Sequence, residues 1–425
     1  MIKNLLKSAT GVAIIPLLVI FCTLFAGCSM LILEDDVVGL TIARTTDLLL
    51  LIDDSLFTSI ESSIDQYVQD VHAQDCSVRV VRWQEGTFTD LKALIQESHS
   101  LDKIGGAFLV GNIPSAWYEN EGFYGYEAFP CDVYLMDTDA AWQDNDGNGI
   151  LDYHSSLELD IYVSRISGTV EELQQYFEKI HAYRNGNLAV DRSAYIFKDN
   201  AWIDFEKGST FGLDDLYANI TVYEEFPDTV KQAYMEKLTS DSAEYVYQWI
   251  HAYPPLLCIE ESDLFNNIFT SEIMQHNLRG LFFNLFNCSA SRFTEENIAM
   301  TCLVKTDYGL ATTGTTKPGG NYYPKAFHYL LSQGNSWGEA FRGWYNHFGI
   351  TSDKWFLGMV ILGDPMLTIS TTVHKVLKTA PLTQIPPSEE MMEELEHTLI
   401  EFTDGYGELT YEDYKEAYPQ FFKHN

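Results

Sequence analysis

The first part of the chain alternates short apolar runs with amphipathic segments, and this alternation restricts the folds open to it. Strand-like runs occupy Asp47–Asp53, Ser77–Trp83 and Gly105–Gly111. Between them, Ser59–His72 and Thr89–Ser98 repeat apolar residues at helical spacing. Strands separated by single helices indicate βαβ units with right-handed crossovers. We therefore predict an α/β fold, a mostly parallel sheet flanked by helices on both faces.

Two further apolar runs, Leu256–Ile259 and Gly280–Phe286, have the length and composition of central strands buried on both faces. We predict that they are neighbours in the parallel sheet. The segment before them, Ser242–His251, is predicted to be helical, and Cys131–Asp137 to be another strand. Chemistry in open α/β sheets gathers outside the carboxyl ends of the strands. The residues that follow the two runs are therefore the candidates for an active site.

A thiol follows one run and acidic residues follow the other. Cys288 comes directly after Gly280–Phe286, within Asn-Cys-Ser-Ala-Ser, whereas Glu260, Glu261 and Asp263 follow Leu256–Ile259. This arrangement is typical of a cysteine nucleophile with a polar partner. A carboxylate next to a thiol raises the pKa of that thiol and disfavours the thiolate, so Glu261 is a poor substitute for an imidazole.

The N-terminus has the pattern of an export signal. Lysines precede an apolar stretch that ends in Leu-Phe-Ala-Gly-Cys, which indicates a bacterial lipoprotein signal peptide over residues 1–27 and a lipid on Cys28. An ordinary secretory signal or an uncleaved anchor is the alternative. We expect a tether over 28–45, an α/β domain over 46–372 and an acidic extension over 373–425. The predicted location is the cell envelope, extracytoplasmic and lipid-anchored in the membrane.

The charge and the cysteines narrow the classes of partner. The chain of 425 residues has a formal net charge of −35, which argues against binding to nucleic acid because phosphates are repelled. Seven cysteines occur, and five remain after Cys22 and Cys28 are set aside. Their number is odd and their spacing irregular, so the sequence indicates neither a disulfide framework nor a CxxC metal site.

An Asp-rich loop carries the spacing of a calcium site. Asp144, Asp146, Asn148 and Asp152 stand at positions 1, 3, 5 and 9 of an EF-hand-type loop, and Ile150 would supply a backbone carbonyl. Position 12 is Ser155 rather than glutamate, so another carboxylate must close the shell. Candidates are Asp137, Asp139 and Glu158. We predict a structural Ca²⁺ here, the alternative being a solvated acidic loop.

Four stretches together carry a family resemblance. They are DLLLLIDDSLFTSIESSIDQYVQDV, GGAFLVGNIPSAWYE, the Asp-rich loop with ELDIYVSRI, and FFNLFNCSASRF followed by YGLATTGTTKPG and LGDPMLTI. Their order and spacing over about residues 45–370 resemble the gingipain-type cysteine peptidases, which have a caspase-like fold. The resemblance implies that Cys288 is the nucleophile. It also implies a catalytic histidine after the neighbouring strand, where this sequence has Glu261.

Other histidines could replace the missing base. His251 precedes the expected strand Leu256–Glu261, whose six residues at ~3.3 Å each would put it roughly 20 Å away, at the opposite end of the strand. His276 lies between the two runs, and His154 lies near the Asp-rich loop. The sequence thus favours a lipoprotein relative of these endopeptidases with weak or no activity. The alternatives are an active endopeptidase whose histidine comes from elsewhere, and a non-catalytic scaffold that binds a protein or peptide.

Overall fold

The computed structural model describes Leu40, Ile42 and residues 47–369, apart from 123–124, 189–190, 260–266 and 322. The signal peptide, Cys28 and the acidic extension predicted from the sequence lie outside the described residues, as does Glu261. All described helices and strands, within residues 47–369, belong to one compact unit. Among these helices, none is both long and apolar enough to cross a membrane.

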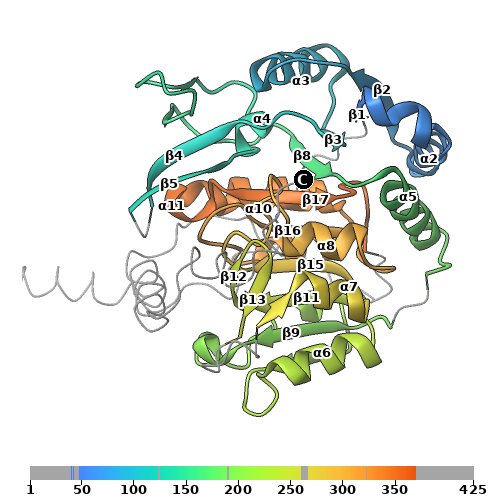
Figure 1. Ribbon diagram of the computed structural model, residues 1–425, viewed down its shortest axis with the longest axis vertical. Helices are drawn as coiled ribbons and strands as arrows, with labels where there is room; N and C mark the ends of the chain where they lie inside the picture. The colour runs from blue at the N-terminus through green and yellow to red at the C-terminus, as the bar shows by residue number, and fades with distance from the viewer. Residues whose placement is uncertain are drawn as a thin grey trace, which may run out of the picture. The chain divides into compact units, whose positions relative to one another are not determined.

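A ten-stranded sheet forms the centre of this unit (Figure 1). Its order across the sheet is β10 (Ile220–Tyr223), β9 (Ala194–Lys198), β11 (Ala243–Trp249), β15 (Gly280–Phe286), β16 (Ala311–Thr315), β17 (Met359–Gly363), β8 (Tyr162–Ile166), β3 (Gly106–Val110), β1 (Asp47–Asp53) and β2 (Ser77–Trp83). Every neighbouring pair is parallel except β16 and β17. The predicted fold class is confirmed.

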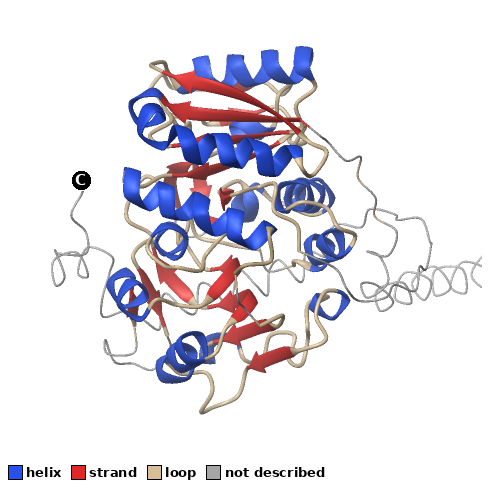
Figure 2. Cartoon of the chain, turned by 90° about the vertical axis from the view of Figure 1, so that its right-hand side faces the viewer, coloured by secondary structure: helices blue, strands red, loops and turns tan. Residues whose placement is uncertain are grey.

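Helices cover both faces of the sheet (Figure 2). They are α2 (Asp54–His72), α3 (Phe88–Asp102), α4 (Val133–Met136), α5 (Val170–Arg184), α6 (Lys231–Ser240), α7 (Thr270–His276), α8 (Ile298–Val304), α9 (Lys325–Ser332), α10 (Trp337–His347) and α11 (Asp353–Phe356). The chain moves from β1 to β2 on one side and then returns past β1 to β3. Right-handed crossovers therefore put α2 and α3 on opposite faces.

Three small antiparallel sheets lie outside the central sheet. They comprise β4 (Trp117–Gly122) with β5 (Gly125–Pro130), β6 (Trp142–Gln143) with β7 (Tyr153–His154), and the set β12 (His251–Tyr253), β13 (Leu256–Cys258) and β14 (Ile268–Phe269). The β4–β5 hairpin and the β12–β14 set matter most here, because both supply residues near Cys288.

The apolar runs that predicted the central strands form the core of the sheet. Leu48 to Ile52 in β1 are fully buried, and all seven residues of β15 are buried, as expected for strands covered by helices on both faces. The predicted ranges of β1, β2 and β15 match the observed bounds. Burial of each such side chain contributes roughly 1.5–3 kcal/mol.

Three predicted elements are wrong. The segment Ser242–His251 is strand β11 rather than a helix, and Cys131–Asp137 contains the short helix α4 rather than a strand. Leu256–Ile259 is not a central parallel strand, because β13 pairs antiparallel with β12 and β14 in a separate small sheet. Pro254 and Pro255 form the turn between β12 and β13. The parallel neighbour of β15 on this side is β11.

Candidate active site

The register of β11 and β15 places a histidine beside the candidate nucleophile. Trp249 is the partner of Phe286 at the carboxyl ends of these two parallel strands. One residue further on, the Ile250 amide still donates to the Phe286 carbonyl, over 3.4 Å. His251 and Cys288 each come two residues after the paired strand ends, so they leave the sheet at the same edge. The expectation that His251 lies at the opposite end is therefore wrong.

A second thiol lies in the same place. In the small antiparallel sheet, His251 is the register partner of Cys258. Burial raises the pKa of the Cys258 thiol, and the charges of Asp199 and of a Cys288 thiolate raise it further. Cys258 is thus close to both His251 and Cys288, which supports the proximity inferred from the β11–β15 register.

His251 is held in an apolar, aromatic environment. Its side chain is buried, and its ring lies 4.9 Å from the Trp202 ring, centroid to centroid, with 32° between the planes. Burial holds the pKa of His251 well below the ordinary value of 6.5. The imidazole is therefore neutral at pH 7, the form in which it can accept a proton.

Cys288 sits on a sharp turn at the end of β15. The next residue, Ser289, has a φ of +57°, and its amide donates to the Lys317 carbonyl over 2.9 Å. Burial raises the pKa of the Cys288 thiol. A hydrogen bond from the Gly319 amide and the charge of Lys317 act in the opposite direction, towards the thiolate. The turn thus places the thiol within hydrogen-bonding reach of the Gly319 amide and within the electrostatic influence of Lys317.

The Gly319–Gly320 segment approaches the strand ends closely. Both glycines have positive φ, +136° and +148°. A Cβ on Gly319 would lie 2.6 Å from the Trp355 carbonyl oxygen, and one on Gly320 would lie 2.9 Å from the Phe286 Cα. Only glycine allows this approach, which brings the Gly319 amide to the sulfur of Cys288.

A buried ion pair lies near the thiol. The Lys317 ammonium is 2.7 Å from Glu127 Oε1, and the two side chains are 1% and 13% exposed. Lys317 also donates to the backbone carbonyls of Pro318 and Lys354. Glu127 comes from strand β5, so the β4–β5 hairpin is tied to the loop that follows β16. Burial lowers the pKa of Lys317, and Glu127 acts to raise it.

The other candidate histidines have different surroundings. His154 Nε2 is 2.9 Å from Asp353 Oδ2 and lies on β7 against Trp142. His276 ends α7, the helix that precedes β15, so it lies towards the amino edge of the sheet, away from Cys288. Of the three histidines considered, only His251 shares the strand edge of the thiol.

The acidic residues before β8 divide into two groups. Asp144 accepts backbone hydrogen bonds from Gly147, Asn148 and Gly149, so its carboxylate holds the predicted calcium loop in a tight turn. Asp152 accepts instead from the Asn145 amide and side chain. The calcium set built on Asp144 stays a prediction.

A cluster of three carboxylates lies outside that loop. Asp137, Asp139 and Asp160 offer oxygens that all lie within 4.8 Å of one another. Asp137 is fully buried, and among the described residues its Oδ2 atom has no hydrogen-bond partner. Burial raises the pKa of Asp137, and the Lys92 ammonium, which donates to the Asp137 backbone carbonyl, acts against that rise.

Comparison with known protein families shows the family to which the chain belongs. The family model described as peptidase family C25 matches residues 98–370, well over half of the chain. The protein belongs to peptidase family C25. This is the gingipain family, so the resemblance noted in the sequence is confirmed. The match includes Cys288, His251 and the Lys317–Gly320 segment.

Other comparisons add little to the C25 assignment. No curated protein matches the chain. A solved structure named as a LacI transcriptional regulator from Bacteroides fragilis is 12% identical, with 68% of this chain and 89% of that chain covered. Its TM-score is 0.17, too low to carry an argument.

For this C25 chain, sequence reasoning found the thiol but missed the residues around it. Reading Leu256–Ile259 as the neighbouring strand put Glu261 in the place of the base. That premise is wrong, and Glu261 itself lies outside the described residues. Sequence reasoning placed His251 at the wrong end of its strand and missed Lys317 and Gly319. A useful signal was the Lys-Pro-Gly-Gly run after a small, buried strand, since paired glycines mark a close approach of the backbone.

Proposed function

We propose that this protein is a cysteine peptidase in which Cys288 is the nucleophile and His251 is the general base. The observation that carries the proposal is the Trp249–Phe286 register, which brings both residues to the same edge of the sheet. Membership of family C25 supports the reaction class. Because β11 is the parallel neighbour of β15, the residue that follows the neighbouring strand is His251 rather than Glu261, which favours activity.

The residues support a two-step hydrolysis. Neutral His251 accepts the proton of the Cys288 thiol as the sulfur attacks the substrate carbonyl carbon, which gives a tetrahedral oxyanion. The imidazolium then donates that proton to the leaving amine, and a thioester remains on Cys288. Water, deprotonated by His251, attacks the thioester and releases the carboxylic acid and the thiol. Lys317 and the Gly319 amide favour the thiolate by charge and by hydrogen bonding.

Labelling of the thiol tests this proposal. A peptidyl chloromethyl ketone should alkylate the protein at pH 7, and the label should be absent from Cys288→Ala. His251→Ala should slow labelling by about a hundredfold, within the range of general-base contributions. Cys302→Ala, which removes a buried thiol in α8, is the matched control and should label normally. Equal labelling of the wild type and His251→Ala would leave the scaffold alternative in place.

We propose further that a Ca²⁺ ion binds among the acidic residues before β8. The buried Oδ2 atom of Asp137 and the proximity of Asp139 and Asp160 favour this trio as ligands, beside the loop Asp144–Asp152 predicted from spacing. Carboxylate oxygens are the ligands that Ca²⁺ prefers. Such an ion would offset the repulsion among the three carboxylates and hold the segment between α4 and β8 in place.

We infer from the N-terminal pattern that the chain is exported and anchored by lipid on Cys28. The support is the lysine-flanked apolar stretch that ends in Leu-Phe-Ala-Gly-Cys. Expression in bacteria with an alkyne-labelled fatty acid tests this: label should enter the wild type and be absent from Cys28→Ser. Label in both proteins would contradict the anchor.

A further inference from the structure

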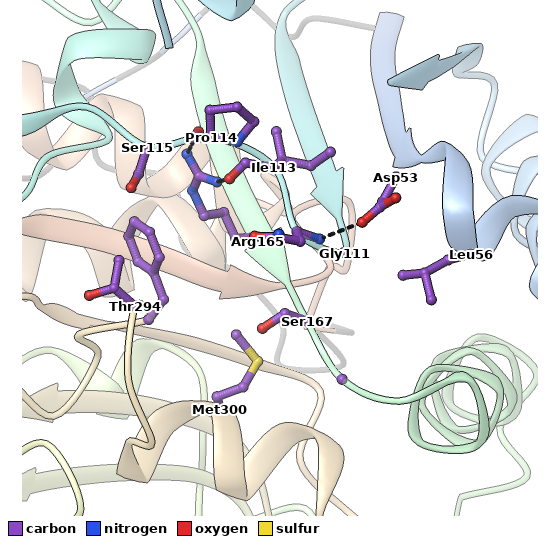
Figure 3. Close-up of a pocket in the computed structure, with 13 residues that line it drawn as sticks. Asp53, Leu56, Gly111, Ile113, Pro114, Ser115, Arg165, Ser167, Thr294 and Met300 are labelled. Carbon is purple, nitrogen blue, oxygen red and sulfur yellow. Dashed lines mark hydrogen bonds between the residues drawn. The ribbon is translucent and has the colours of Figure 1, made fainter. Parts of the chain in front are cut away.

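A pocket separate from the Cys288–His251 pair opens at the carboxyl ends of β1, β3 and β8 (Figure 3). Its volume is about 490 Å³, within the range of ligand-binding sites. The chain runs from β1 to β2 on one side and then to β3 on the other, so the strand order reverses between β1 and β3. Ligands of α/β sheets bind at such a reversal.

The lining of the pocket combines uncharged polar groups with apolar side chains. Asn112, Ser115, Ser167 and Thr294 supply amide and hydroxyl groups, and the apolar side chains of the lining are Leu56, Ile113, Pro114, Phe293 and Met300. Ser167 lies near the middle of the group, with Met300 below it and Gly111 above (Figure 3).

The charged groups of the pocket are already paired. Arg165 holds Asp132 through Nε and Nη2, at 2.6 and 2.8 Å, and donates to the carbonyls of Ile113 and Pro114. Asp53 accepts from the Ser55 amide and hydroxyl and from the Asn112 amide. Arg165, the cation of the two, is therefore already paired, so the described lining of the pocket offers no unpaired side-chain cation to an anionic ligand. The lining instead suits an uncharged ligand with amide groups and an apolar side chain.

The pocket is continuous with the segment that carries the nucleophile. Phe293 and Thr294 lie a few residues after Cys288, and Met300 lies in the first turns of α8. The guanidinium of Arg165 stacks over Phe293, 4.7 Å from the ring centroid. Whatever occupies the pocket thus contacts the segment that leads away from the thiol.

The spacing of the sheet sets the reach from Cys288 to the pocket. Strands β15 and β8 are three positions apart, and β15 and β1 are five apart. At ~4.8 Å per step, these separations are roughly 14 and 24 Å. An extended peptide advances ~3.3 Å per residue, so its residues about four to seven positions from the scissile bond would reach the pocket.

We propose that this pocket is a remote substrate subsite, which binds the extended backbone and one apolar side chain of a polypeptide about four to seven residues from the bond cleaved at Cys288. The inference rests on the proposed peptidase function. It makes unfolded or extended polypeptides, rather than short peptides, the preferred substrate class.

Cleavage of matched long and short peptides tests the subsite. Cleavage sites in β-casein are mapped by mass spectrometry, and peptides with two or eight residues on each side of a site are synthesised. Ser167→Trp, which fills the pocket, should lower kcat/KM for the long peptide about tenfold more than for the short one. Ser115→Trp provides a second filling variant on another element. Ser62→Trp, on the exposed face of α2, is the control. Equal effects of both pocket variants on the two peptides would overturn the proposal.

Binding without turnover separates this proposal from the proposed function. Fluorescein-labelled, unfolded β-casein is titrated into Cys288→Ala protein with and without Ser167→Trp, and fluorescence anisotropy is measured. The pocket variant should bind about tenfold more weakly. If the wild type cleaves no casein, the peptidase function fails, and the anisotropy still decides the subsite: equal affinity with and without Ser167→Trp refutes it.

Discussion

Lys317 and Glu127, 190 positions apart in the chain, form a buried ion pair with a separation of 2.7 Å in the electrostatic range of the Cys288 thiol. Their effects on the thiol are opposite in sign. Lys317 lowers the pKa of Cys288, and Glu127 raises it. The pair therefore contributes, beside burial and the Gly319 hydrogen bond, to how much thiolate exists at a given pH, and each partner can be removed separately.

Removal of Glu127 and removal of Lys317 should change the reactivity of Cys288 in opposite directions. Glu127→Gln should speed alkylation by iodoacetamide at pH 7, because the cation then acts on the thiol alone. Lys317→Met should slow it and should also destabilise the fold by about 3 kcal/mol, since a buried carboxylate loses its partner. The measurement is the pH–rate profile of alkylation, with the double variant as control. Profiles that shift in the same direction would contradict this account.

Gly319→Ala should impair the thiol without removing any charged group. Its new Cβ would meet the Trp355 carbonyl, so the backbone must shift and the Gly319 amide would leave the sulfur. Alkylation of Cys288 should slow about tenfold. Gly125→Ala is the matched control, because that glycine also has positive φ, +93°, yet a Cβ there meets nothing within 4 Å. Labelling that slows equally in both variants would show backbone strain alone to be the cause.

Buried histidines should make the fold sensitive to acid. Burial lowers the pKa of His328 to about 3, and that of His251 also lies well below 6.5. The unfolded chain binds protons at these sites below pH ~6.5 while the folded chain does not. For His328, the free energy of unfolding should therefore fall by about 1.4 kcal/mol per pH unit as pH drops from 6.5 towards 3, and His251 should add to this fall.

Urea unfolding at pH 7 and pH 5 measures this effect. His328→Gln should reduce the difference in stability between the two pH values relative to the wild type, even if it lowers stability at both. His72→Gln, at the exposed end of α2, is the control and should leave the difference unchanged. An unchanged difference in His328→Gln would mean that this ring is accessible to protons in the folded state.

Chelation should test the calcium proposal and distinguish its two ligand sets. EDTA should lower the melting temperature, because a bound ion at a hundred times its Kd adds about 2.7 kcal/mol to stability. If the trio holds the ion, Asp160→Asn should abolish the response to EDTA, whereas Asp144→Asn should not. The reverse outcome would favour the loop Asp144–Asp152. A melting temperature that EDTA does not change in the wild type would exclude both sets.

The sequence was sufficient for strands whose buried residues are almost all apolar. The largely apolar runs Asp47–Asp53 and Gly280–Phe286 matched β1 and β15 in full. The βαβ order also predicted the parallel sheet. These features depend on local composition, which a sequence displays directly.

Strand β11 was misread because its polar residues are satisfied by distant partners. Glu244 pairs with Arg192 and Tyr183, and Gln248 bonds to Tyr234 and Asn287. A short stretch of sequence does not show such distant partners. Without them, a buried Glu or Gln is improbable in a central strand. Because of this error, the prediction put Glu261 rather than His251 at the strand edge beside Cys288.

The position of β17 has a consequence for how the protein is made. It is the last described strand in the chain, yet it lies between β16 and β8 and is the only link between the β1–β3 half of the described sheet and the β9–β16 half. Until Met359–Gly363 has emerged during synthesis, no described strand can pair the two halves into one sheet. Any proteolytic or translational loss of that segment should release two incomplete sheets with open edges, which are prone to aggregate. Assembly of the complete sheet therefore depends on synthesis of the chain through Met359–Gly363.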